Sequence, residues 1–107
     1  MAKYAWTWKI KPEFVDEYVR MHMKPWPEIM VKHSEAGFKN FSIFQNGCQF
    51  FYEFECDLEN VNDAFMFLEE DKDCKRWTSI TSKMVDGGFD FGQSEPIVFM
   101  REIFYLK

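Results

Sequence analysis

Three side chains suited to handling a polar ligand lie close together near residue 20. Tyr18 and His22 are four residues apart, which places them on one face of a helix, and Trp26 follows shortly after. An imidazole titrates near neutral pH and is the commonest general acid or base, whereas a phenol or an indole joins an apolar ring to a polar tip. A cluster of these three side chains suits the binding of a sugar, because rings pack on its apolar C–H faces while polar tips bond its hydroxyls. The same spacing also suits a tyrosine and a histidine that only cap a core or make a surface hydrogen bond.

The helix that carries this pair is expected to end soon after His22. The residue before a proline is disfavoured in the α region, so Pro25 should end the helix near Met23 or Lys24. His22 would then lie near a helix C-terminus, where the helix dipole favours the imidazolium form.

The remaining candidate ligand residues do not predict a metal site. His33 is the only other histidine, and we expect it to have a structural role. The three cysteines form no C-x-x-C pair, so we expect reduced thiols in a reducing compartment, with a cytoplasmic location. The sequence therefore gives little support for a metal site.

Length and composition restrict the class of protein. The chain has 107 residues, of which 47% are hydrophobic and 20% aromatic, so it should fold as a single domain over residues 1–107. Its formal charge is −5 without a run of Lys or Arg, which argues against nucleic acid as a partner. We also expect no membrane partner, because no stretch approaches the roughly 20 apolar residues of a membrane span.

Hydrophobic periodicity predicts alternating element types. Period-two runs indicate strands and helical spacings indicate helices, with Asn46-Gly47 as the turn of a hairpin. The expected order is a strand over 3–10, helices from 12 to about 24 and over 27–36, strands over 38–45 and 48–56, helices over 60–69 and 73–85, a loop over 87–96, and a strand over 97–106.

This order predicts the α+β class with a ferredoxin-like β-α-β-β-α-β arrangement around an antiparallel sheet. Both helical layers should cover one face of the sheet and leave the other bare. Large rings occur on both faces of the predicted third strand, where Phe50 and Tyr52 alternate with Phe51. An exposed apolar face usually marks a partner surface, so we expect a homodimer that buries sheet against sheet, as a dimeric α+β barrel with a pocket beside the sheet.

The stretch YVRMHMKPWPEI, residues 18–29, resembles a motif of the L-rhamnose mutarotase family. That motif is approximately E-Y-x-x-R/K-H-x-x-x-W-P-E-L, and the residues at its positions here are Glu17, Tyr18, His22, Trp26, Pro27 and Glu28. Further matches are Ile43, Arg76-Trp77 and the closing Ile103-Phe104-Tyr105-Leu106, so the resemblance spans nearly the whole chain.

The resemblance implies a small dimeric sugar mutarotase without a cofactor. Such enzymes interconvert the α and β anomers of a monosaccharide, here a 6-deoxy-hexose such as L-rhamnose. By this resemblance His22 is the proton donor and Tyr18 binds the sugar. Trp77 forms an aromatic wall, and we expect Trp26 to wall the site as well.

Three positions depart from the family pattern. Thr78 stands where relatives have the second tryptophan of a Trp-Trp pair, and Phe41 stands where they have a tyrosine that would contact the sugar. Glu53 stands where small or apolar residues are usual, and it either replaces a lost polar contact or is a rim or interface carboxylate. L-Fucose or another sugar is therefore an alternative substrate. A non-catalytic binding domain and an oxygenase of the same fold are alternatives from other classes.

Overall fold

The computed structural model describes residues 2–56, 61–88 and 97–107. Within these ranges the predicted order of elements is confirmed as far as residue 81. The elements are β1 (Ala2–Lys9), a 3₁₀ turn (Pro12–Phe14), α1 (Val15–Met23), α2 (Pro27–Glu35), β2 (Phe38–Asn46), β3 (Gln49–Cys56), α3 (Val61–Glu69) and α4 (Lys72–Thr81). Residue 60, where the third helix was expected to begin, and most of the predicted 87–96 loop lie outside the described residues.

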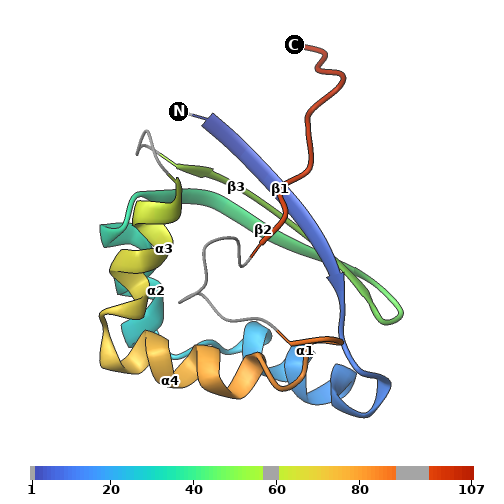
Figure 1. Ribbon diagram of the computed structural model, residues 1–107, viewed down its shortest axis with the longest axis vertical. Coiled ribbons are helices and arrows are strands. Elements are labelled where there is room, and N and C mark those ends of the chain that lie inside the picture. Colours follow the sequence, from blue (N-terminus) through green and yellow to red (C-terminus); the bar gives the residue numbers. More distant parts are fainter. Residues whose placement is uncertain (1, 57–60, 89–96) are drawn as a thin grey trace.

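The three strands form one antiparallel sheet with β3 in the centre, in the order β1-β3-β2. The helices lie against one face of this sheet, as the α+β prediction requires (Figure 1). The sheet and the helices thus form two layers with the core between them.

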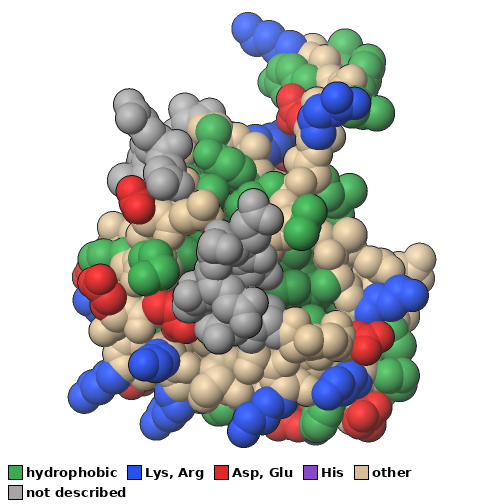
Figure 2. All heavy atoms as spheres, viewed as in Figure 1, with side chains coloured by type: hydrophobic (Ala, Val, Ile, Leu, Met, Phe, Trp, Pro, Cys, Tyr) green, Lys and Arg blue, Asp and Glu red, His purple; other side chains and the backbone are tan. Residues whose placement is uncertain are grey.

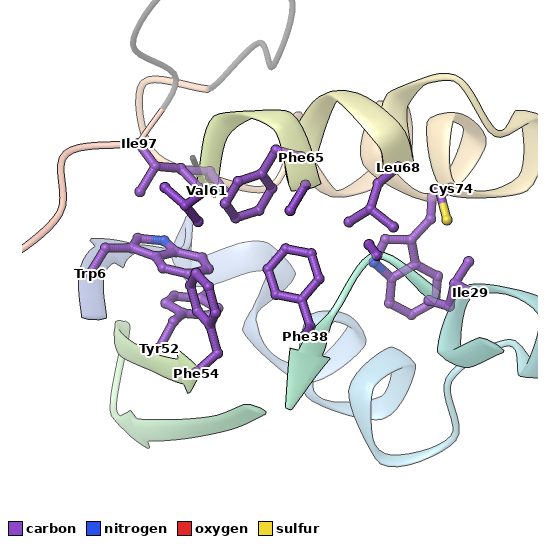
Figure 3. Close-up of a cluster of buried hydrophobic side chains, with 14 of the residues drawn as sticks. Trp6, Ile29, Phe38, Tyr52, Phe54, Val61, Phe65, Leu68, Cys74 and Ile97 are labelled. Carbon is purple, nitrogen blue, oxygen red and sulfur yellow. The ribbon is translucent and has the colours of Figure 1, made fainter. Parts of the chain in front are cut away.

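Strand alternation explains the core. Along β3 every second side chain is buried against the helices, and Tyr52 and Phe54 are at most 2% exposed. Trp6 on β1 stacks flat on Tyr52, with ring centroids 4.4 Å apart and an interplanar angle of 4°. Helices α2 and α3 contribute Ile29 and Phe65 to the same cluster (Figure 3).

The outer face of the sheet is mixed. Phe44 is 58% exposed and its ring lies 6.3 Å from that of Phe51, so some apolar surface does face outward. Lys3 and Glu53 form an ion pair on the same face, with 3.4 Å between nitrogen and oxygen. The expectation of a bare face with large rings is therefore met only in part.

The predicted hairpin is present, but its turn lies one residue later than expected. Asn46 pairs with Gln49, so Gly47 and Cys48 are the two loop residues. Gly47 has a φ of 62°, a value that glycine adopts without the steric cost that other residues pay. Glycine is the residue that type II′ hairpins place first in the loop, which explains the shift.

Helix α1 ends at Met23, as the proline rule predicts. Helix α4 ends at Thr81, earlier than the predicted 85, because Val85 instead forms an isolated β-bridge with Ile10. The side chain of Asp71 caps α4 at its start by accepting hydrogen bonds from the backbone N–H groups of Asp73 (3.1 Å) and Cys74 (3.0 Å).

The predicted strand over 97–106 is wrong for the single chain. Residues 97–107 form no strand, and the backbone bond from Met100 N–H to the carbonyl of Ala5 (2.7 Å) is the one that joins them to β1. Beyond this bond the segment leaves the edge of β1 and projects from the body (Figure 1). A strand needs a partner for its backbone groups along its length, and the described part of this chain supplies one only at Ala5.

Candidate functional site

A cavity of about 630 Å³ lies between the inner face of the sheet and the helices. Its size falls within the range of small-molecule sites, roughly 300–1,000 Å³. Five of the seven predicted site residues line it, namely Tyr18, His22, Phe41, Trp77 and Thr78.

Helices α1 and α4 bring three of these side chains into contact. Tyr18, which is 3% exposed, lies one turn before His22 on α1, and their ring centroids are 4.3 Å apart. Trp77 on α4 packs against His22 with centroids 5.3 Å apart and an interplanar angle of 76°. Tyr18, His22 and Trp77 therefore form one continuous wall.

The tautomer of His22 follows from its hydrogen bond. Nδ1 of His22 lies 2.7 Å from the carbonyl oxygen of Tyr18, and a carbonyl can only accept, so Nδ1 carries the proton. Nε2 has no hydrogen-bond partner among the described residues. In the neutral ring this nitrogen is a proton acceptor.

Burial decides the charge of His22. It lowers the pKa of His22 below its ordinary 6.5, and the charge of His33 lowers it further, while the hydrogen bond to the Tyr18 carbonyl opposes both. The expected stabilisation of the imidazolium by the helix dipole is therefore outweighed. His22 is neutral at pH 7, with Nε2 able to accept a proton.

Trp26 lies behind the wall. It does not line the cavity but packs against Trp77 with ring centroids 5.0 Å apart, and the guanidinium of Arg76 lies 4.4 Å from its ring centroid. The two prolines that end α1 and begin α2 turn the chain so that Trp26 supports Trp77. The expectation that Trp26 walls the site is corrected to a supporting role.

Glu53 also lies outside the cavity. Its neighbour Tyr52 points inward, and because side chains alternate along a strand, Glu53 points to the outer face and pairs with Lys3. The hypothesis that Glu53 contacts the ligand is not supported, whereas its alternative as a surface carboxylate agrees with this position.

Three cavity residues were missed by the sequence analysis. Tyr52 and Trp8 line the cavity, and Nε1 of Trp8 and the hydroxyl of Tyr18 each lie 2.5 Å from the hydroxyl of Tyr52. His33 also lines it, with Nδ1 2.6 Å from the carbonyl oxygen of Ile29. Strand alternation assigns Trp8 and Tyr52 each to one face of its strand, but it does not say which face points inward, and no spacing rule brings their polar atoms to Tyr18.

Burial also keeps the two phenols protonated. It raises the pKa of Tyr18 to about 12, although the hydrogen bonds from Tyr52 and Trp8 oppose this change. The pKa of Tyr52 is raised as well, first by burial and then by the nearby Tyr18. At neutral pH the cavity therefore offers the neutral imidazole of His22 and two neutral phenolic hydroxyls, beside the imidazole of His33, whose pKa burial also lowers.

No three His, Cys, Asp or Glu side chains in the described ranges gather in a way that could hold a metal ion. None of the described helices is long and apolar enough to cross a membrane.

The fold and the cavity together define a class: small ferredoxin-like α+β proteins with a cavity between sheet and helices. Sequence comparison then gives the family. The profile of L-rhamnose mutarotase matches residues 3–106, nearly the whole chain, and the protein belongs to the L-rhamnose mutarotase family, a family of isomerases.

Individual relatives agree with this assignment. L-rhamnose mutarotases of Lactiplantibacillus plantarum and Shouchella clausii are 29% and 26% identical to this chain, and each alignment covers 99% of both proteins. The crystal structure of L-rhamnose mutarotase FA22100 from Formosa agariphila superposes with a TM-score of 0.71 over 100% of both chains at 18% identity, which supports the fold.

Proposed function

We propose that this protein is a sugar mutarotase that interconverts the α and β anomers of L-rhamnose, with His22 as its acid/base group. The observation that carries the proposal is the geometry of His22, whose Nδ1 is held by the carbonyl of Tyr18 while Nε2 is left free in a cavity walled by Trp77. A neutral imidazole in this position is able to accept a proton from a bound hydroxyl and return it.

The chemistry needs only proton transfers. Nε2 of neutral His22 accepts the proton of the anomeric hydroxyl, the C1–O5 bond breaks as the C1 carbonyl forms, and the imidazolium of His22 gives that proton to O5. Rotation about C1–C2 and the reverse steps then close the ring on the other face of the carbonyl, with His22 moving the proton from O5 back to O1. Because His22 passes through the imidazolium within each step, it is also the proton donor, which reconciles its neutral resting state with the donor role that the resemblance implies.

The choice of L-rhamnose rests on the names of the family and of both relatives. Phe41 and Thr78 line the cavity, so their departures from the family pattern bear directly on the ligand. A phenyl ring at 41 suits an apolar part of a sugar, such as the methyl group of a 6-deoxy-hexose. L-Fucose, another 6-deoxy-hexose, is the first alternative substrate to compare.

We also propose a homodimer. The C-terminal segment exposes Ile103 (82%), Phe104 (77%) and Leu106 (80%). Figure 2 shows hydrophobic side chains gathered on a segment that stands clear of the body. A second copy that pairs with this segment would remove that apolar surface from water.

The three unpaired cysteines further support a reducing compartment, and hence the cytoplasm.

The proposed activity is tested by anomer-exchange NMR. The purified protein is added to L-rhamnose and to L-fucose, and saturation transfer between the two anomeric protons is measured against the uncatalysed rate. We expect faster exchange with L-rhamnose, and His22→Gln should lower the catalysed rate roughly 10²-fold or more, the contribution typical of general acid–base catalysis.

His33→Gln is the matched comparison. Like His22, His33 lines the cavity and its Nδ1 bonds a backbone carbonyl four residues earlier on its own helix. Its ring, however, contacts the rings of Phe38 and Phe41 instead of those of Tyr18 and Trp77. We expect it to retain activity within about tenfold, since it lacks the contacts of His22. Sugar binding without acceleration of any anomer exchange would favour the non-catalytic alternative and sink the mutarotase proposal.

A further inference from the structure

A chain of three polar side chains closes one side of the cavity. The indole Nε1 of Trp8 lies 2.5 Å from the hydroxyl of Tyr52, which lies 2.5 Å from the hydroxyl of Tyr18. An indole N–H can only donate, so Tyr52 accepts the bond from Trp8. All three residues line the cavity.

Counting protons shows that this chain is incomplete. Trp8 contributes one N–H, and each tyrosine contributes one O–H. The two bonds use the indole proton and one phenolic proton, so the second phenolic proton has no partner among the described residues. A buried hydroxyl without a partner is costly, which points to a ligand oxygen as the missing acceptor.

The direction of the chain identifies the free hydroxyl. When Tyr52 accepts from Trp8 and donates to Tyr18, Tyr52 accepts one bond and donates one, an arrangement in which successive bonds polarise and strengthen one another. Tyr18 then points its own O–H into the cavity, on the helix that also presents His22 one turn later.

Packing fixes both phenols in place. Tyr52 is clamped by Trp6, which stacks on it 4.4 Å away, and the ring of Trp8 contacts it edge-on at 5.3 Å. Tyr18 is held by an edge contact with Phe50 at 5.1 Å. Packing therefore fixes the positions of both phenolic oxygens before a ligand arrives, while the O–H of Tyr18 can rotate about its C–O bond toward a ligand oxygen.

We infer that Trp8 and Tyr52 are positioning residues that hold Tyr18 as a hydrogen-bond donor to one oxygen of the bound sugar, an inference that rests on the proposed mutarotase function. The ligand class is a cyclic aldose with an oxygen facing Tyr18 while its anomeric hydroxyl faces His22. A deoxy analogue without that oxygen leaves the Tyr18 proton unpaired and binds less well.

Kinetic variants test the chain. We expect Tyr52→Phe to raise KM about tenfold with a smaller change in kcat, since a single hydrogen bond to the ground state is weakened. In a Tyr18→Phe background the same substitution should change KM less than about twofold, because Tyr52 acts through Tyr18. Tyr4→Phe is the matched control, a half-buried tyrosine on β1 that packs on Phe54 and does not line the cavity.

A second readout needs no activity. The indole N–H signals of the four tryptophans are resolved by ¹H–¹⁵N NMR of the sugar-free protein, and Trp8→Phe assigns the Trp8 signal by its loss. Tyr52→Phe should move the Trp8 signal upfield, and Tyr4→Phe should leave it in place. An unmoved Trp8 signal, an unchanged KM in active Tyr52→Phe, or additive effects with Tyr18→Phe would each overturn the inference. A wild type inactive on every sugar would overturn the proposed function itself.

Discussion

At the scale of single residues, the charge of His22 is set by competition between two effects. A position in the last turn of α1 favours the imidazolium, but burial in an aromatic cavity disfavours it, and the pKa is lowered from 6.5. Burial prevails because desolvation acts on the whole imidazolium, whereas the dipole of a nine-residue helix contributes only a partial charge at its end. The proposed resting enzyme is therefore a base.

This gives a prediction for the pH profile. With neutral His22 as the reactive form, kcat/KM should stay level at pH 7–8 and fall only as the pH drops below the ordinary value of 6.5, where the imidazolium accumulates. The measurement is anomer exchange across this range, with the uncatalysed rate subtracted at each pH. Activity that falls instead as the pH rises above 6.5 would show that the imidazolium is the resting form.

At the scale of elements, helix ends place the site residues. Pro25 and Pro27 end α1 and begin α2, so that His22 lies in a last turn and Trp26 lies against Trp77. The start of α4 is fixed by the cap at Asp71, whose carboxylate accepts two backbone N–H bonds. Because α4 carries Trp77, this cap also holds one wall of the cavity.

We therefore expect Asp71→Ala to lower the thermal midpoint, while Asp71→Asn, which keeps an accepting oxygen, should retain most of it. The backbone bonds lower the pKa of Asp71 below 3.8, so the carboxylate stabilises the fold at neutral pH, and this stabilisation is lost as the pH falls below that value. In thermal melts the advantage of the wild type over Asp71→Asn should be present at pH 7 and shrink as the pH falls below 3.8, while Asp71→Asn should stay above Asp71→Ala at every pH. A wild-type advantage over Asp71→Asn that is constant at all pH values would assign it to something other than the charge of the cap.

At the scale of the whole molecule, the C-terminal segment is the feature that the single chain leaves incomplete. Three strands form the sheet, and the segment expected to supply the fourth is bonded to β1 at Ala5 and is exposed beyond Met100. The outer face of the sheet adds a half-exposed Phe44. Both features fit the proposed homodimer, in which a second copy covers apolar surface.

The dimer has a direct test in light scattering after size exclusion. The wild type should have about twice the 13.0 kDa mass of the chain, and Ile103→Asp combined with Leu106→Asp should shift it toward the monomer, because two charges would enter the interface. Val31→Asp, on a 56% exposed position of α2, is the control and should leave the mass unchanged. A monomeric wild type at tens of micromolar would contradict the proposal.

The sequence by itself determined what depends on local patterns. Period-two alternation predicted the strands and which residues share a face of each, and helical spacing predicted that Tyr18 and His22 share a face. The proline rule predicted where α1 ends. The resemblance to a known family then pointed to Trp77 as an aromatic wall of the site, and the structure places Trp77 at the cavity, against the ring of His22.

Only the tertiary structure decided how distant side chains meet. Trp8, Tyr52 and Tyr18 come from two strands and a helix, and no spacing along the chain brings their polar atoms together. Glu53 and Tyr52 are adjacent in sequence yet lie on opposite faces, so the choice between ligand contact and surface ion pair depended on the orientation of β3. The last segment has strand-like alternation, but a strand forms only where another backbone accepts its hydrogen bonds, and that partner is a property of the assembled fold.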